Sequence, residues 1–375
     1  MANIERILIV GGGIAGLTLA TALRQRGFRP ELIERSPSWQ TVGAGIAVQP
    51  NGMRILQALG MGAAVERAGA VIRHWSFCDQ HGDVLSETDL DGLWGEVGRF
   101  IGIQRATLHQ VLLDGAAALP YRLGVSVTSL AQVGDCVSVG LSDGSTSTYD
   151  LVVGADGIAS TVRKLTLSAA PPVDAGQIAW RSLAPIRPRG STKLQFLLGD
   201  GCFFGLCPVG DGHTYGFGNV SEPRFHDAVE GRLARLRERF ASFGGLVQDY
   251  LGALEADEQI HCSAIEWVEQ EQWHAGRVVL IGDAAHASSP MMGQGGCLAM
   301  EDAYVLAEVL CSAASVESAL DTYVGRRKSR VTWVQLASRA VAESFRAPPA
   351  VRNGALRELG DRLMHQRYAP LISEP

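Results

Sequence analysis

Several features of membrane, secreted and nucleic-acid-binding proteins are missing from this sequence. It has no run of about 18 uninterrupted apolar residues, so we expect no transmembrane segment. Its start, MANIERILIVGGG, has no charged segment followed by a long apolar one, so we expect no signal peptide. Positive charge is not in excess: the formal net charge is −6, which makes nucleic acid an unexpected partner.

Cysteine patterns are also absent. The seven cysteines are scattered, odd in number and contain no C-x-x-C pair, which favours reduced, buried thiols in a cytoplasmic protein, and no metal site is expected. Repeats and low-complexity segments are missing too. The chain has 375 residues, 46% of them hydrophobic, which is enough for a core that can bury a ligand.

The N-terminus has the pattern of a β-α-β unit. Residues 4–10 form an apolar, β-branched run that predicts a buried strand. Residues 14–27 have helical apolar spacing and end at Gly27, a residue suited to a helix C-terminus. Residues 30–35 predict a second strand.

The rest of the chain alternates between two patterns. Residues 71–90 predict a hairpin around Gly82, residues 101–119 have helical spacing, and residues 124–157 predict short strands. Strand-like sequence fills most of 176–270, with a helix expected near 227–255; residues 277–286 predict a further buried strand before a mostly helical end. We therefore expect an α/β fold with two interleaved domains. The predicted parts are a Rossmann-like domain (1–70, 98–175 and 271–345), a sheet-rich domain (71–97 and 176–270) and a helical segment (346–375).

Gly11, Gly13 and Gly16 form the pattern G-x-G-x-x-G between the first strand and the first helix. The first glycine permits a tight turn, the second lets a pyrophosphate approach the backbone, and the third lets helix and strand pack closely. Free N–H groups and the positive end of the helix dipole then face the phosphates. Glu34 closes the second strand, where a carboxylate accepts hydrogen bonds from an adenosine ribose. This combination predicts a dinucleotide site but does not distinguish FAD from NAD.

Two further motifs accompany the fingerprint: LVVGADGIASTVRK (151–164) and IGDAAHASSPMMGQGGCLAMEDA (281–303). The three motifs together, in this order, resemble the class A, single-component FAD-dependent aromatic monooxygenases over nearly the whole chain. The short length is similar to the urate, salicylate-type and alkylquinolone hydroxylases and the tetracycline-inactivating enzymes of that family. The stretches AWRSLAP and RLMHQR look most like the alkylquinolone-hydroxylating branch.

The resemblance implies roles for individual residues. Asp283 would accept a hydrogen bond from the flavin ribitol, the backbone of 293–296 would pass close to the isoalloxazine ring, and Arg105 would contact phosphate or ribityl oxygens. Two roles are open for Asp156 and Arg163, and neither is favoured: contact with NAD(P)H, or a structural ion pair that stabilises their loop. The expected cofactor-binding residues are Gly11, Gly13, Ile14, Ala15, Gly16, Glu34, Arg35, Gly45, Arg105, Asp156, Gly157, Arg163, Gly282, Asp283, Pro290, Gly293, Gly295 and Gly296.

The resemblance further implies hydroxylation of an aromatic or heteroaromatic small molecule by O2 through a flavin C4a-hydroperoxide, with NAD(P)H as reductant. The helix that follows Gly296 would direct its positive end toward the reduced flavin. The sheet-rich domain would cover the substrate, and aromatic faces there would hold a planar molecule. The candidates are Trp180, Gln195, Phe203, Phe204, Leu206, Tyr215, Phe217 and Pro290, with Asn219 and Arg181 beside them. Urate-hydroxylating relatives carry an arginine near the position of Phe203, and this difference favours a more apolar substrate.

No residue is identified as a catalytic acid or base. His74, His213 and Tyr215 are eligible by type, while His286 and the basic stretch GRRKSR (325–330) are interpreted as a structural histidine and a solvated helix face. An oxidase or dehydrogenase on the same scaffold remains an alternative, as does an FAD-binding protein without turnover. The W-x-W-x-I-P motif of flavin halogenases is absent. We expect a monomer or weak dimer, because the sequence ends without the thioredoxin-like domain of longer relatives.

Overall fold

The computed structural model describes residues 4–39, 44–117, 119–167, 170–186 and 191–375. Its first sheet has the strand order β18-β19-β12-β1-β2-β8, and β1, β2, β8, β12 and β19 run parallel. The strands are β1 (Ile7–Val10), β2 (Glu31–Glu34), β8 (Tyr121–Leu123), β12 (Leu151–Gly154), β18 (His274–Ala275) and β19 (Val278–Leu280). The apolar runs at 7–10 and 151–154 are completely buried, as expected for central strands of a parallel sheet.

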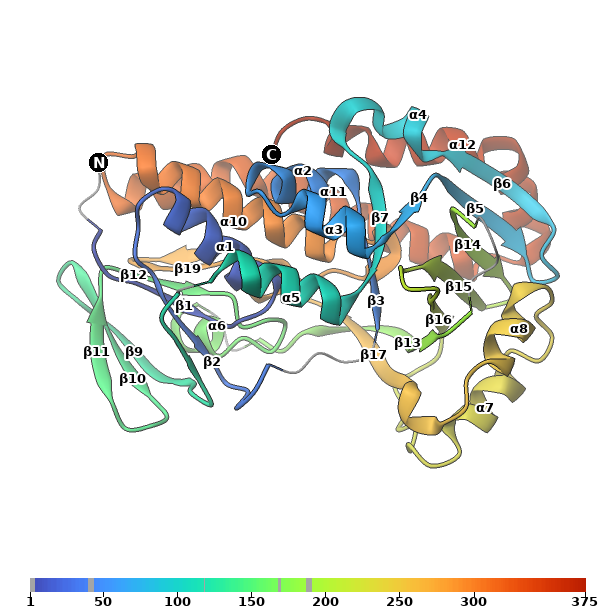
Figure 1. The fold of residues 1–375 in the computed structure, drawn as a ribbon, viewed down its shortest axis with the longest axis horizontal. Coiled ribbons are helices and arrows are strands. Elements are labelled where there is room, and N and C mark those ends of the chain that lie inside the picture. The colour runs from blue at the N-terminus through green and yellow to red at the C-terminus, as the bar shows by residue number, and fades with distance from the viewer. Residues whose placement is uncertain (1–3, 40–43, 118, 168–169, 187–190) are drawn as a thin grey trace.

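Helices pack against both the sheet and one another (Figure 1). Helix α1 (Ile14–Gln25) follows the fingerprint and packs on α10 (Gly295–Ser312), and α5 (Arg105–Gly115) lies beside α1. The predicted helix at 101–119 begins later than expected, because residues 100–104 form strand β7. Other helices of this part are α2 (Pro50–Ala58), α3 (Gly62–Ala68), α6 (Thr161–Thr166) and α9 (Asp283–His286).

A second sheet has the strand order β17-β13-β16-β15-β14-β5-β6. Its strands are β5 (His74–Asp79), β6 (Val84–Asp89), β13 (Val173–Ala184), β14 (Lys193–Leu198), β15 (Cys202–Pro208), β16 (Thr214–Val220) and β17 (His261–Trp267). The hairpin predicted around Gly82 is β5–β6. Strands from 74–89 thus join strands from 173–267 in one sheet.

Smaller elements complete the described residues. Strands β3 (Gly45–Val48), β4 (Ala70–Ile72) and β7 (Phe100–Gln104) form one three-stranded sheet, and β9 (Val127–Val133), β10 (Cys136–Leu141) and β11 (Thr146–Tyr149) form another. The helix expected near 227–255 is two short helices, α7 (Arg232–Arg239) and α8 (Leu246–Gly252), which cover one face of the seven-stranded sheet. Helix α4 (Leu90–Trp94) and the 3-10 turns Gly95–Val97, Asp257–Gln259 and Pro290–Met292 lie in connections.

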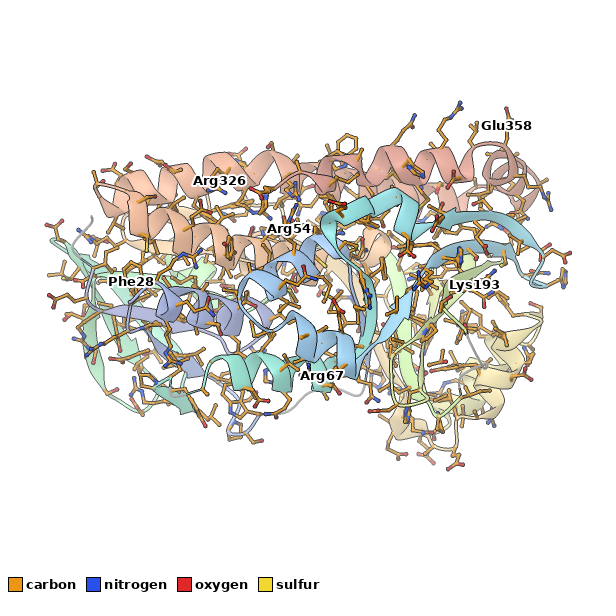
Figure 2. All side chains as sticks on the ribbon, turned by 45° about the horizontal axis from the view of Figure 1, so that its top comes forward. Phe28, Arg54, Arg67, Lys193, Arg326 and Glu358 are labelled. Carbon is orange, nitrogen blue, oxygen red and sulfur yellow. The ribbon has the colours of Figure 1, made fainter. Side chains whose placement is uncertain are left out.

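Two long helices complete the fold: α11 (Val316–Arg346) runs along the molecule, and α12 (Pro349–Ile372) lies at the end that holds β5 and β6 (Figure 1). In Figure 2, Arg326 of α11 and Glu358 of α12 mark far-apart points of this helical layer. Helix α12 packs against β6 of the second sheet. Of the helices in the described ranges, none is both long and apolar enough to cross a bilayer.

Candidate active site

The glycine fingerprint makes a close-packed turn with open space on one side. Gly11 has φ +111°, and a methyl group there would lie 2.4 Å from the carbonyl oxygen of Ala155. A methyl group at Gly16 would lie 1.9 Å from the carbonyl oxygen of Gly11. Around Gly13, by contrast, a methyl group would meet no described atom within 4 Å. The turn is therefore tightly packed against the protein at Gly11 and Gly16 and open at Gly13, where a pyrophosphate would approach, as a dinucleotide fingerprint requires.

Glu34 lies at this open side. Its carboxylate accepts hydrogen bonds from the backbone N–H of Gly12 (2.8 Å) and of Ser36 (2.9 Å). The sequence did not single out two aromatic neighbours: the ring of Trp39 covers Gly12, and Nε2 of His109 lies 2.9 Å from the carbonyl oxygen of Gly12. Neither has a spacing pattern that marks it in the sequence. Arg35, another predicted cofactor residue, is exposed directly after β2.

Asp156 and Arg163 brace the loop between β12 and α6. Asp156 accepts hydrogen bonds from Ser160 Oγ (2.5 Å) and from the backbone N–H of Thr161 (2.7 Å). Arg163 is buried and donates to the carbonyl oxygens of Ala284 (2.7 Å) and Ile158 (2.7 Å). Burial lowers the pKa of Arg163 from its ordinary value, although the charge of Asp156 opposes this. Arg163 thus connects the loop that contains Gly157 to the segment that contains Asp283.

Asp283 begins the one-turn helix α9, next to the start of α10. Its side chain is exposed, and a methyl group at Gly295 would lie 3.8 Å from its Oδ1. Gly282 has φ +58° and packs against Ala15 and Ala299, so the segment fits closely between α1 and α10. Gly296 faces the side chains of Ile46 and Ile14. The carboxylate of Asp283 and the N-terminus of α10 therefore lie beside the same glycine-lined space as the fingerprint helix.

A buried network of charged side chains stabilises the segment that contains Gly282 and Asp283. Asp302 on α10 accepts hydrogen bonds from the backbone N–H of Gly282 (2.9 Å), from His286 Nε2 (2.5 Å) and from Arg327 Nε (2.8 Å). Burial by itself raises the pKa of Asp302, but the charges of His286 and Arg327 outweigh it and hold the pKa well below its ordinary value. His286 is buried, and this contact connects it to Asp302.

The basic stretch 325–330 is not the solvated helix face that the sequence suggested. Arg327 is fully buried between Glu301 and Asp302, and Arg330 makes two hydrogen bonds to Glu301 (2.9 and 2.8 Å). Both arginines face α10 because they are three residues apart on one helix, and residues at that spacing share a face. Their carboxylate partners lie more than twenty residues earlier in the chain, so spacing within the stretch could not reveal them.

The loop that connects Pro290 to Gly296 is held by buried polar side chains from two distant segments. Gln49 donates to the carbonyl oxygen of Met292 (2.8 Å), and Gln294 donates to Gln49 Oε1 (2.7 Å). Asn51 donates to Gln294 (2.9 Å) and to Glu301 (3.0 Å). Tyr368 of α12 donates to the same carbonyl of Met292 (2.9 Å). None of the three residues outside the loop that hold it, Gln49, Asn51 and Tyr368, was predicted from the sequence.

The substrate candidates fall on opposite faces of the seven-stranded sheet, because side chains alternate along a strand. Phe203, Phe217 and Tyr215 face the large core that is shared with the dinucleotide-binding part. Trp180, Phe204 and Leu206 belong instead to the small core under α7 and α8, and Gln195 lies on that same side beside Tyr250. The predicted substrate candidates therefore do not all share one face of the sheet.

The inner face of this sheet carries a cluster of rings. Phe217 lies 6.3 Å from Phe203 and 5.1 Å from Tyr215 between ring centroids, and Phe196 and Phe345 complete the cluster. A methyl group at Gly45 of β3 would lie 2.4 Å from Cβ of Tyr215. The predicted cofactor residue Gly45 thus contacts the predicted substrate residue Tyr215, and the two halves of the site meet there.

Basic side chains border the ring cluster at one edge. Arg181 donates to Ser263 Oγ (2.8 Å) and pairs across the strands with His261. Burial raises the pKa of the Tyr215 hydroxyl, while the charges of Arg181 and Arg105 oppose the shift. Burial also lowers the pKa of His261, and Arg181, Arg232 and Arg105 lower it further. Arg105 itself is exposed at the start of α5. At this edge the arginines therefore partly offset the effect of burial on a negative charge.

The other two base candidates have ordinary surroundings. Because neighbouring side chains alternate along a strand, His74 points to the face of β5 opposite to that of Trp75. There its Nδ1 lies 3.7 Å from Oε1 of Glu87. His213 lies in the turn between β15 and β16, where its Nδ1 is 2.8 Å from the carbonyl oxygen of Asp211. Tyr215 is the one of the three whose ring contacts the cluster of rings.

The fold and the site together define a dinucleotide-binding protein whose second sheet presents a cluster of rings next to Gly45. The residues fit FAD: the open space around Gly13 suits a pyrophosphate, and Asp283 presents an exposed carboxylate beside Gly295 that would accept from a hydroxyl group of the cofactor. Residues 5–338 match the family described as "FAD binding domain", and the chain belongs to this family.

Known relatives agree with this assignment. The chain is 35% identical to aurachin C monooxygenase/isomerase of Stigmatella aurantiaca (91% of this chain, 88% of the relative). It is 30% identical to 2-heptyl-3-hydroxy-4(1H)-quinolone synthase of Pseudomonas aeruginosa (98% of each). The solved structure of Klebsiella pneumoniae HpxO with FAD and uric acid matches with TM-score 0.92 at 30% identity (100% of this chain, 98% of that chain). The protein is an FAD-dependent monooxygenase of the aromatic hydroxylase type, as its motifs predicted.

Proposed function

We propose that the protein hydroxylates a planar, largely apolar heteroaromatic compound, using NAD(P)H and O2, in the cytoplasm and as a monomer or weak dimer. One observation carries the substrate class: the inner face of the seven-stranded sheet is lined by Tyr215, Phe217 and Phe203, and Tyr215 contacts Gly45 of the cofactor-binding part. Aromatic faces at this position favour a flat substrate. The relatives whose names specify a quinolone and the structure with bound uric acid support a heteroaromatic ring.

FAD, when bound, supplies the activation of O2 and the transfer of one oxygen atom. The residues of this chain bind and orient. Gly11, Gly13 and Gly16 would admit the pyrophosphate, Glu34 would accept from the ribose, and Asp283 would accept from the ribitol. The N-terminus of α10, which begins at Gly295, would direct its positive dipole end toward the flavin. The ring cluster excludes water from the reacting centre.

We further propose roles for the residues around this core. The backbone of Ile14, Ala15, Gly282, Gly293, Gly295 and Gly296 lines the cofactor, with Arg35 and Arg105 near its phosphate or ribityl oxygens and Pro290 beneath the substrate. Asp156, Gly157 and Arg163 hold the loop between the two cofactor-binding segments. The positive charges of Arg181 and Arg105 would partly offset the effect of burial on a substrate oxygen that gains negative charge.

The test is a panel of quinolones, phenols and related heteroaromatics given to the FAD-loaded protein with NADH or NADPH. We expect at least one compound to stimulate NAD(P)H oxidation and to gain one oxygen atom that derives from labelled O2. Stimulated oxidation that yields only hydrogen peroxide would instead show an oxidase. The Asp283→Ala variant should lose FAD during gel filtration, whereas Asp321→Ala, at an exposed position on α11, should retain it.

A further inference from the structure

Two buried amide side chains on the inner face of the seven-stranded sheet are incompletely paired. Gln177 and Asn219 are 1% and 3% exposed. Nε2 of Gln177 donates to Oδ1 of Asn219 (3.2 Å). The remaining acceptor, Gln177 Oε1, and the remaining donor, Asn219 Nδ2, have no hydrogen-bond partner among the described residues. If both amides were turned over, one donor and one acceptor would again remain, so this result does not depend on how the amides are oriented.

The pair lies on the face that the proposed function assigns to the substrate. Asn219 alternates with Tyr215 and Phe217 on β16 and pairs across the strands with Phe203 and Ala179. The intervening Gly216 and Gly218 face the opposite side, where methyl groups would meet Tyr250 and Phe240. The amides therefore share the inner face with the ring cluster.

Two hydroxyl groups on facing elements are also buried without partners among the described residues: Ser289, next to Pro290, and Ser338 on α11. Helix α11 contacts the Pro290–Met292 turn, and its Phe345 lies 5.3 Å from Phe203 between ring centroids. The elements around the amides thus carry further unpaired polar groups. Buried polar groups are nearly always paired in folded proteins, and an unpaired group indicates a missing partner.

We propose that Gln177 and Asn219 form a specificity subsite for a neutral cyclic amide. The ring N–H of such a substrate donates to the free carbonyl oxygen, and its C=O accepts from the free N–H, while the ring itself lies against Phe217 and Phe203. Arg181 on this face of β13 is bonded to Ser263, and Arg346 donates to the carbonyl oxygens of Ala175 and Gly176, so the amides select a neutral donor–acceptor edge rather than a carboxylate. This inference rests on the proposed function for the position of the substrate.

The test measures binding separately from turnover. Isothermal titration calorimetry of the full, FAD-loaded chain with 2(1H)-quinolone and with its 1-methyl derivative compares a probe that has the ring N–H with one that lacks it. We expect the wild-type protein to bind 2(1H)-quinolone at least tenfold more tightly. The Asn219→Leu and Gln177→Met variants should reduce this ratio to less than about threefold, because each removes one side of the subsite. Gln195→Met makes the same chemical change on the opposite face and should keep the wild-type ratio.

Equal wild-type affinities for the two probes would overturn the subsite, and so would a ratio that survives in both variants, since enclosed water would then satisfy the amides. Circular dichroism and FAD content identify a variant that fails to fold, and the other variant then decides. Selective binding of 2(1H)-quinolone without any oxygenated product in the panel would leave the subsite standing and refute the proposed function. Hydroxylation of panel compounds without selective binding of 2(1H)-quinolone would support the proposed function and refute the subsite.

Discussion

Nε of Arg327 lies 2.8 Å from Oδ1 of Asp302, and both side chains are completely buried. The same carboxylate accepts from the backbone N–H of Gly282, one residue before Asp283. Breaking a buried ion pair from one side is costly, because it leaves an uncompensated charge.

Asp302→Asn should therefore lower the free energy of unfolding by about 3–5 kcal/mol. Because the Gly282 contact is weakened as well, FAD should dissociate more readily. Urea unfolding and a fluorescence titration with FAD measure the two effects. Asp91→Asn, which alters an exposed ion pair with Arg73, is the matched control and should change stability by less than about 1 kcal/mol. An Asp302→Asn protein as stable as the wild type would contradict the role of Asp302 as the partner of the buried Arg327.

The stability should also depend on pH through this carboxylate. His286 and Arg327 hold the pKa of Asp302 below its value in the unfolded chain, about 4. Its contribution is complete above the unfolded pKa and is lost as the pH falls through the folded pKa. The difference in unfolding free energy between wild type and Asp302→Asn should be constant above about pH 5 and should narrow below about pH 4. If the difference in unfolding free energy widened as the pH falls, the pH dependence could not come from the lowered pKa of Asp302.

The fingerprint glycines should respond differently to alanine. Gly16→Ala places a methyl group 1.9 Å from a carbonyl oxygen, so the FAD-free protein should lose stability by at least about 1–3 kcal/mol. Gly13 has φ −81° and open space around it, so Gly13→Ala should leave the melting temperature of the FAD-free protein nearly unchanged. Its affinity for FAD should nevertheless fall at least tenfold, because the methyl group occupies the approach of the pyrophosphate. Unchanged FAD affinity in Gly13→Ala would place the pyrophosphate elsewhere.

Tyr368→Phe removes the hydrogen bond to the carbonyl oxygen of Met292 and should cost about 1 kcal/mol of stability. Because Met292 belongs to the loop that we place beside the flavin, the flavin absorption maximum and the kcat for the best panel substrate should shift as well. Tyr304→Phe, on the side of α10 where the ring stacks under Arg26, is the control. A loss of stability with unchanged spectrum and kcat would assign Tyr368 a purely structural role.

Local sequence patterns were sufficient to predict the turn of the glycine fingerprint and one β-hairpin. The turn at Gly11–Gly16 depends on backbone freedom and close packing within a few residues, and these are visible in the sequence. The paired strands β5 and β6 were likewise predicted from adjacent residues and a glycine turn.

The support of the site could not be predicted in this way. Glu301 and Asp302 find their arginines in another helix, and Tyr368 reaches a carbonyl group 76 residues earlier in the chain. The sequence could have shown that the substrate candidates do not all share one face of the sheet, because Phe203 and Phe204 are adjacent in one strand and must face opposite sides. Which side faces the cofactor depends on where α7 and α8 pack, and that is a tertiary property.

The loop from Pro290 to Gly296 is held by residues near position 50 and by Tyr368, which lies in the last helix. During synthesis the glycine fingerprint therefore leaves the ribosome well before Tyr368, the residue that completes the support of this loop. The nascent chain can form its fingerprint turn early, whereas the loop from Pro290 to Gly296 gains its last hydrogen bond only after α12 has been made.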